Sequence, residues 1–385
     1  TTAGTYAWAR LGSHPSRPQK TGYADVLEFT GIDSRYYDHP RLQKFYSWFF
    51  GSLLTPGRKL HVFGDFIFGG GPRPGALMYR GGRFGDRAGQ YAAWALEDYE
   101  PPGHVLAYVL KERSFDPRVP SSRLYANGGG FFREPEDSPD SLGAMLYNVA
   151  SPVGWHAHQE TNALSLWAYG ARLLVNGGWL GPDRRPAILN NTLTINDEEH
   201  ASRTGAGLQG GLTGPGLDYA RGLSGDALPG DASFHRNLIL VHGREATGGY
   251  FVTMDEIEAG QTDTVSYCLH PATGTRPTAT TPKAEYEAQI DRFNEVEDVS
   301  LSVFLGNRPE RVEREMVSTG SARANEVDHC RLKAVYPTDG DGKAEIITVL
   351  YPHTPERGKP DFARIRGDGL RGVSVAHRAE IAEST

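Results

Sequence analysis

The chain has 385 residues, of which 38% are hydrophobic and 23% are charged, so it can bury a sizeable core in two domains or in one large repetitive domain. The net charge of -7 excludes a basic nucleic-acid-binding surface as the default interpretation, and no apolar run approaches the roughly 18 residues that a membrane span requires. The 47 glycines and 25 prolines are spread along the chain and favour a turn-rich, largely β architecture.

The first third of the sequence is predicted to be helical. Residues 41–50 follow Pro40, with Asp38 as the expected N-cap. Their apolar side chains recur at helical spacing and form one face: Leu42, Phe45, Tyr46 and Phe49. Two more amphipathic helices are expected at residues 86–98 and 104–113. Helical hairpins joined by glycine-rich loops are typical of an α/α toroid or solenoid, which we predict for residues 1–117.

From residue 118 onward, short or alternating apolar segments are separated by turn signals. Strands are predicted at residues 143–150, 162–168, 172–175, 193–195, 237–242, 250–257, 264–269, 300–305, 331–336, 346–351 and 373–376, with a hairpin tip at 338–342. Residues 285–294 fit either a helix or a charged loop. Roughly a dozen strands without intervening helices predict a large antiparallel β-sandwich over residues 118–385.

The chain contains two cysteines, Cys268 and Cys330. Two are too few for a disulfide scaffold or a cysteine-ligated zinc module. The sequence leaves open whether the two thiols form one bridge or stay reduced.

The stretch with the most chemical information is residues 154–162. On an extended strand alternate side chains share a face, so His156, His158 and Glu160 are expected to point the same way, about 7 Å apart at each step. Three titratable groups on one face of a sheet are costly to bury without a purpose. A lone histidine is usually a structural residue, whereas this triad favours a functional site as strongly as a structural one.

Three interpretations of the triad compete. It could bind a metal as in a cupin, because imidazole and carboxylate are ordinary zinc or iron ligands, although the second histidine motif of a cupin is not evident. The histidines could act directly in acid–base chemistry. The sandwich could also be a non-catalytic, carbohydrate-binding or structural domain.

Residues 156–166, 169–178 and 190–195 resemble the heparinase II/III-type polysaccharide lyases. In that family a His-x-His-x-Asp strand is followed by a Leu-Leu-x-Asp-x-Gly strand and then by a His-Asn-Thr strand. Tyr6 is similar to the catalytic tyrosine of the family, Arg10 to a substrate-contacting arginine, and residues 61–65 to the Gly-Asp segment that closes the helical domain. The resemblance implies an incomplete α/α toroid followed by a large antiparallel β-sandwich, with the substrate cleft between them.

The resemblance also implies an activity, the β-elimination of a uronic-acid-containing polysaccharide. Tyr6 would be the acid, or acid and base, and His156 the base or stabiliser. If residues 4–11 are helical, Tyr6 and Arg10 share a face, and the guanidinium would lower the pKa of the phenol. The residues expected to contact the substrate are Arg10, Trp155, His158, Glu160, Trp179 and Asn191. All uronate polysaccharides carry the same carboxylate beside the scissile bond, so the expectation covers the class.

The sequence has Glu160 where the family motif has an aspartate, and it departs from the zinc-binding members of the family at two ligand positions. Where zinc-binding members have an aspartate and a histidine as ligands beside the equivalent of His158, this chain has Asn176 and Asn190. A neutral amide is a poor zinc ligand, so we expect no metal and no cofactor. The partners expected are an acidic polysaccharide and a preceding segment or second chain that completes the toroid, without nucleic acid, in a secreted or periplasmic protein.

Overall fold

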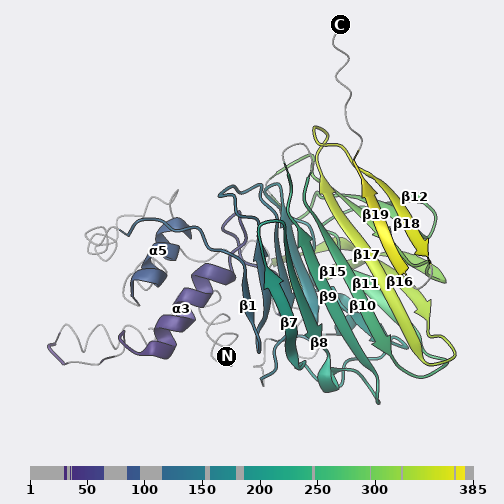
Figure 1. The fold of residues 1–385 in the computed structure, drawn as a ribbon, viewed down its shortest axis with the longest axis horizontal. Helices are drawn as coiled ribbons and strands as arrows, with labels where there is room; N and C mark the ends of the chain where they lie inside the picture. The colour runs from purple at the N-terminus through teal and green to yellow at the C-terminus, as the bar shows by residue number, and fades with distance from the viewer. Residues whose placement is uncertain are drawn as a thin grey trace, which may run out of the picture.

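The computed structural model describes residues 30–32, 35, 37–64, 85–95, 115–151, 157–178, 186–244, 248–294, 296–321, 324–367 and 370–377 (Figure 1). These residues form two α-helices, α3 (Pro40–Ser52) and α5 (Asp86–Ala95), which precede a body of antiparallel sheets. Neither helix has the length and apolarity that a membrane-spanning helix requires.

Helix α3 confirms the predicted helix at residues 41–50. It starts at Pro40, where a proline ring fixes a helical φ and the missing N–H costs nothing. Its N-cap is His39 and not the predicted Asp38, because Nδ1 of His39 accepts a hydrogen bond from the backbone N–H of Arg41 at 3.3 Å. Helix α5 confirms the start of the helix predicted at 86–98, whereas the helix predicted at 104–113 lies outside the described residues.

Nineteen strands follow in the described part of the chain. They are β1 (Arg123–Tyr125), β2 (Gly129–Arg133), β3 (Gly143–Tyr147), β4 (Ala163–Ala168), β5 (Ala171–Arg172), β6 (Leu193–Ile195), β7 (Gly207–Thr213), β8 (Leu217–Leu223), β9 (Ser233–Val241), β10 (Tyr250–Glu258), β11 (Thr264–Leu269), β12 (Thr278–Thr281), β13 (Glu285–Gln289), β14 (Ser300–Leu305), β15 (Arg311–Ser321), β16 (Ala324–Pro337), β17 (Lys343–His353), β18 (Asp361–Gly367) and β19 (Leu370–Ala376). Two short 3-10 helices, η1 (Ala187–Leu189) and η2 (Gly225–Ala227), interrupt them.

The segment 285–294 is a correction to the sequence analysis. Its first half is strand β13, neither a helix nor a charged loop. The strand pairs with β14, and Tyr286 and Ala288 are buried while the alternating residues Glu285, Glu287 and Gln289 are not. Buried and more exposed residues do alternate, but over only five residues. In so short a segment that also carries charged residues, a period of two is hard to recognise in the sequence.

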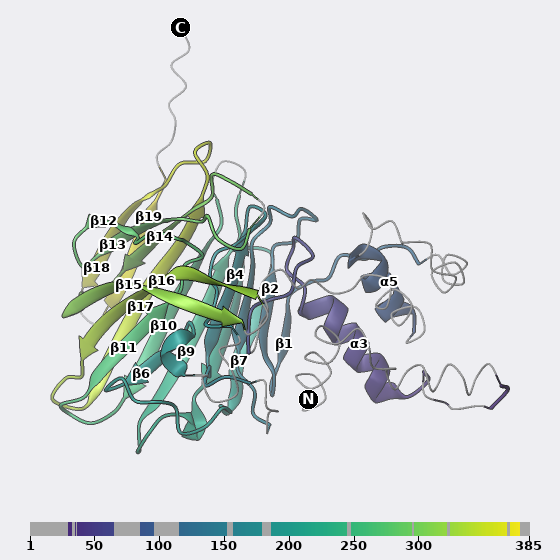
Figure 2. The same cartoon turned by 180° about the vertical axis from the view of Figure 1, so that it is seen from behind.

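The strands build four sheets, all of them antiparallel (Figures 1 and 2). An eight-stranded sheet has the order β12-β13-β14-β17-β10-β9-β8-β7, and a five-stranded sheet has the order β1-β2-β3-β4-β5. A four-stranded sheet, β15-β16-β11-β6, and the β18-β19 hairpin complete the layers. This arrangement confirms the predicted β-sandwich.

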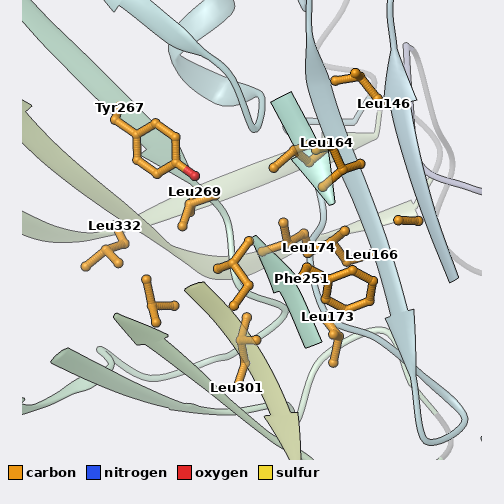
Figure 3. Close-up of a cluster of buried hydrophobic side chains, with 14 of the residues drawn as sticks. Leu146, Leu164, Leu166, Leu173, Leu174, Phe251, Tyr267, Leu269, Leu301 and Leu332 are labelled. Carbon is orange, nitrogen blue, oxygen red and sulfur yellow. The ribbon is translucent and has the colours of Figure 1, made fainter. Parts of the chain in front are cut away.

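The main core lies between these sheets, as Figure 3 shows. Leucines of β3 and β4 face Phe251 of β10 and Tyr267 of β11 across it. Leu301 of β14 and Leu332 of β16 close the same cluster. Three sheets therefore share one apolar interior, which fixes the positions of the loops at their ends.

A second core joins the helices to the five-stranded sheet. Phe49 of α3 and Trp94 of α5 belong to the same buried cluster as Phe131 and Met145 of the sandwich. Arg133 of β2 is buried there, donates from Nη2 to the backbone oxygen of Leu54 at 2.6 Å, and lies with Cζ 4.5 Å from the centre of the Trp94 ring. Figures 1 and 2 both show α3 and α5 at the β1 end of the sandwich, with α3 nearer to the strands than α5. Of the predicted toroid, the described residues contain these two helices, and the boundary between domains 1–117 and 118–385 stays a prediction.

Candidate functional site

The segment before β4 carries the motif on which the sequence analysis depended. Residues 157–160 are not a strand, so the predicted strand geometry is wrong over this part of the motif. The backbone N–H of Ala163 donates to the carbonyl of Glu160 at 2.9 Å, and Asn162 has a φ of 57°. This turn lies immediately before β4. His158 and Glu160 are nevertheless both 1% exposed.

A hydrogen bond of 3.1 Å joins Nδ1 of His158 to Oδ1 of Asn190. Nδ2 of Asn190 donates to the backbone oxygen of Pro186 at 2.9 Å, which turns Oδ1 of the amide toward the imidazole. An amide oxygen only accepts, so Nδ1 of His158 carries a proton. In the neutral ring Nε2 is then the unprotonated nitrogen, and the pair fixes one tautomer.

Glu160 links the motif to the segment that follows the first helix. Its Oε1 accepts hydrogen bonds from the backbone N–H of Gly64 at 2.7 Å and from that of His158 at 3.4 Å. One carboxylate oxygen therefore contacts both the sandwich and the helical part of the molecule. Gly64 has a φ of 60°, a conformation that glycine adopts without the strain of a side chain.

Asn176 contacts the carbonyl group of the same glycine, whose N–H is bound by Glu160. Its Nδ2 donates to the backbone oxygen of Gly64 at 3.1 Å, and its Oδ1 accepts from the backbone N–H of Gly178 at 3.0 Å. The amide thus uses a donor and an acceptor at once, which an ionised carboxylate cannot do because it only accepts.

The segment around Gly64 is anchored further along β4. The backbone N–H of Val62 donates to Oγ of Ser165 at 3.0 Å, and Nδ1 of His61 lies 3.2 Å from the same oxygen. Burial, with the charges of Arg133 and Arg172, lowers the pKa of His61 to about 3. His61 is therefore a neutral structural residue at physiological pH.

Asn191 holds three parts of the sandwich together. Its Nδ2 donates to the backbone oxygens of Leu164 at 3.1 Å and Val175 at 2.6 Å, and its Oδ1 accepts from the N–H of His270 at 2.7 Å. The side chain is 2% exposed and positions the strands around it. The contact with substrate expected of Asn191 stays a prediction.

Five residues of the predicted site lie outside the described residues: Tyr6, Arg10, Trp155, His156 and Trp179. Their expected roles therefore stay predictions. The structure brings together His158, Glu160, Asn176, Asn190 and Asn191 in one hydrogen-bonded, buried region. The described residues contain no group of three or more histidine, cysteine, aspartate or glutamate side chains that could hold a metal ion.

Two charged residues beneath this region, Arg236 of β9 and Asp255 of β10, were not predicted from the sequence, and both are 0% exposed. The alternation of inward-facing and outward-facing residues along each strand could have identified them. Arg236 falls in the same period-two series as Phe234 and Leu238, so it occupies an inward-facing position. Asp255 does the same in the apolar series of β10. A charge of opposite sign at an inward position of each strand is the pattern of a buried ion pair.

The family model described as "Heparinase II/III-like, C-terminal" matches residues 125–346, which include the described part of the site within the sandwich. No curated protein matches the sequence.

Solved structures share the fold. A mutant of the heparan sulfate lyase HepC from Pedobacter heparinus superposes with a TM-score of 0.67 at 14% identity, covering 93% of this chain and 54% of that chain. A heparinase III structure gives a TM-score of 0.66 at 15% identity, covering 92% of this chain and 56% of that chain. The chain thus spans about half the length of the solved structures that it matches.

Proposed function

The chain belongs to the heparinase II/III-like family, and on that premise we propose that it is a polysaccharide lyase that cleaves a uronic-acid-containing polysaccharide. The observation that carries the proposal is that the family match over residues 125–346 includes the segment with His158 and Glu160 and its partners at Asn176 and Asn190. The fold shared with heparan sulfate lyase HepC supports the same substrate class.

The proposed reaction is a β-elimination. A base removes the proton at C5 of the uronate, the C5–H electrons form the C4–C5 double bond, and the C4–O4 bond breaks as an acid protonates O4. The products are an unsaturated uronate and a shortened chain with a free hydroxyl group. By resemblance, Tyr6 protonates O4 and, for one substrate epimer, also removes the C5 proton, while His156 is the base or stabiliser.

The geometry of the described residues supports this proposal. His158 lies two positions from His156 and is held in one tautomer by Asn190. Glu160 contacts the backbone of His158 and of Gly64, so the histidine segment and the segment after α3 are fixed relative to each other. A lyase whose acid and base come from the two parts of the molecule requires such a rigid connection. Sugar stacking by Trp155 and Trp179, and substrate contacts from Arg10, belong to the same proposal.

We also infer that the chain works without zinc at this place. Oδ1 of Asn190 already accepts a hydrogen bond from His158, and both polar atoms of Asn176 already bond to the backbone. These residues do not fit a zinc ion, since the two amides add no negative charge and their oxygens are engaged. A secreted or periplasmic location, where extracellular polysaccharides are met, completes the proposal.

The experiment is a panel of uronate polysaccharides, scored by the ultraviolet absorbance of the unsaturated product. Alginate, heparan-type, chondroitin-type, hyaluronan and glucuronan chains cover the class. We expect the protein to act on at least one of them, and Tyr6→Phe and His156→Ala each to lower kcat by about 100-fold or more. Tyr219→Phe and His235→Ala, on the partly exposed side of β8 and β9, are the matched controls and should leave kcat unchanged.

The same experiment distinguishes a lyase from a domain that only binds carbohydrate, and the fold bears on the cupin-like alternative. A carbohydrate-binding sandwich without activity would bind a glycan and release no unsaturated product, and the Tyr6 and His156 variants would be silent. The cupin-like alternative requires a single barrel without a helical partner, whereas the chain has separate layered sheets and two helices packed on one of them. The fold therefore contradicts that alternative.

A further inference from the structure

A buried ion pair crosses the middle of the eight-stranded sheet directly beneath the candidate site. Arg236 and Asp255 lie opposite each other in the pairing of β9 with β10. Nε of Arg236 donates to Oδ1 of Asp255 at 2.8 Å, and Nη2 donates to Oδ2 at 2.6 Å. This two-point contact orients the guanidinium plane, as a single hydrogen bond would not.

The third nitrogen of the guanidinium, Nη1, bonds to the backbone of the candidate site. Nη1 of Arg236 donates to the backbone oxygen of Asn162 at 2.8 Å and to that of Asn191 at 2.9 Å. Four of the five N–H groups of the arginine are thus engaged. Burial opposes the charge of Arg236, but the Asp255 carboxylate outweighs burial and raises the pKa of the guanidinium.

The two carbonyls belong to the two segments that make the His158–Asn190 bond. Asn162 ends the turn that follows Glu160, and Asn191 follows Asn190. Three further hydrogen bonds join the same stretches of chain. Oγ1 of Thr192 donates to the backbone oxygen of Thr161 at 2.6 Å. The N–H of Leu164 donates to the backbone oxygen of Asn191 at 3.2 Å, and Nδ2 of Asn191 donates to that of Leu164 at 3.1 Å. The guanidinium adds one hydrogen bond to each segment and, because Arg236 belongs to β9, it ties both segments to the core of the eight-stranded sheet.

We propose that Arg236 is a positioning residue of the site, which keeps the segments of His158 and Asn190 together so that the imidazole stays in one tautomer. The proposal rests on the proposed lyase function for its kinetic consequence, but its structural consequence is independent of any activity. Lysine would not substitute, because it lacks the planar fork that serves a carboxylate and two carbonyls at once.

The test replaces the pair by apolar side chains, as Arg236→Met with Asp255→Leu, because losing only one partner would leave a buried charge. The matched control is Arg221→Met with Glu256→Leu. That pair joins β8 to β10 at 2.8 Å, and Glu256 is the next residue to Asp255, but its side chain is 51% exposed on the other face. Both proteins are first compared by circular dichroism and thermal unfolding.

The first readout is the ¹⁵N NMR signature of the His158 ring, assigned by its loss in His158→Gln. We expect the wild type and the control to show a ring protonated at Nδ1, and the Arg236→Met/Asp255→Leu variant to show exchange between the two tautomers. A folded variant that keeps the wild-type signature would overturn the proposal. If the double variant does not fold, Arg236→Lys, which keeps a cation opposite Asp255, is measured in the same way and judged by the same criterion.

The second readout is kinetic, on whichever uronate polysaccharide the wild type cleaves. The positioning role predicts that kcat falls by about 10- to 100-fold while KM changes by less than about 2-fold, because misplacement weakens the reaction more than binding. A fall in thermal stability with unchanged kcat would reduce Arg236 to a stability residue and contradict the proposal. A wild type inactive on every polysaccharide would refute the proposed function, and the NMR result would still decide the role of Arg236.

Discussion

The side-chain amide of Asn176 donates a hydrogen bond to the backbone oxygen of Gly64, which lies 3.1 Å away and 112 residues earlier in the chain. The N–H of the same glycine is bound by Glu160 at 2.7 Å. Both polar groups of one glycine are therefore held by side chains of the sandwich. Through Glu160, this double contact links the segment after α3 to the histidine motif.

Replacing Asn176 by aspartate should weaken this link. A carboxylate keeps the acceptor for Gly178 but faces the carbonyl of Gly64 with a lone pair, so we expect a loss of about 1–3 kcal/mol in the free energy of unfolding at pH 7. The difference from wild type should shrink at low pH, because a protonated carboxyl group can donate again. Urea unfolding at several pH values measures both effects.

Asn307→Asp is the control for this substitution. Oδ1 of Asn307 accepts from the N–H of Ile347 at 2.8 Å, and a carboxylate accepts equally well. We therefore expect that variant to stay within about 0.5 kcal/mol of wild type. Equal stability losses in the two variants would show that the donor of Asn176 is unimportant.

Buried histidines should make the protein sensitive to acid. Burial lowers the pKa of His61 to about 3, of His200 to about 4 and of His329 to about 4, and with the neighbouring His329 it holds the pKa of His270 well below its usual value. The unfolded chain takes up these protons first, at a pH near 6.5. Stability is therefore fully present above about pH 6.5 and is lost as the pH falls toward 4.

His200→Gln isolates one of these contributions. Nε2 of His200 donates to the backbone oxygen of Leu193 at 2.8 Å, and the glutamine amide can donate from nearly the same place without an ionisable ring. We expect the stability lost between pH 6.5 and 4 to decrease by an amount on the order of 3 kcal/mol. His39→Asn, at an exposed helix cap, should leave the pH dependence unchanged. An unaltered acid profile in His200→Gln would contradict the assignment of a buried neutral ring.

The two cysteines should be inert in the folded protein. They are free and buried, and burial raises the pKa of Cys268 to about 12 and that of Cys330 to about 11. Only the thiolate reacts with alkylating reagents, so we expect no modification by iodoacetamide at pH 8 in native buffer and two modified thiols in urea. Mass spectrometry of intact protein counts the adducts. A fast-reacting thiol in the native state, or a disulfide in the unfolded protein, would disagree with the structure.

Zinc analysis tests the two asparagines of the site. After exposure to excess zinc and dialysis, we expect far less than one zinc per chain by elemental analysis, and no loss of polysaccharide cleavage with a chelator. The physical reason is that Asn176 and Asn190 offer neutral, already bonded amides where a zinc site needs charged or basic ligands. A known zinc enzyme carried through the same dialysis is the control. One stoichiometric zinc would overturn the inference.

Much of the sandwich could be predicted because its strands carry their own signal. The segments predicted at 193–195, 264–269 and 300–305 coincide with β6, β11 and β14, whose residues are nearly all buried. The turn predicted at 338–342 is present, with Gly342 at a φ of 74°, but the predicted hairpin is wrong. The turn joins β16 of the four-stranded sheet to β17 of the eight-stranded sheet, and a turn signal in the sequence does not tell whether the strands on either side of it pair. Strand β7 was missed because it is a glycine-rich, mostly exposed edge strand that needs only backbone pairing with β8.

The sequence by itself determined the class of fold and singled out the histidine motif as the candidate site, because apolar alternation, helix spacing and a compact motif are local properties. Only the tertiary structure decided what that motif touches. His158 bonds to Asn190, and Gly64 bonds to both Glu160 and Asn176. Arg236 donates to two backbone oxygens. These partners are far apart in the sequence and come together through the order of the strands in the sheets, which no local pattern specifies. The physical reason is that a buried polar group must find a partner, and the packing of the sheets determines which one lies within reach.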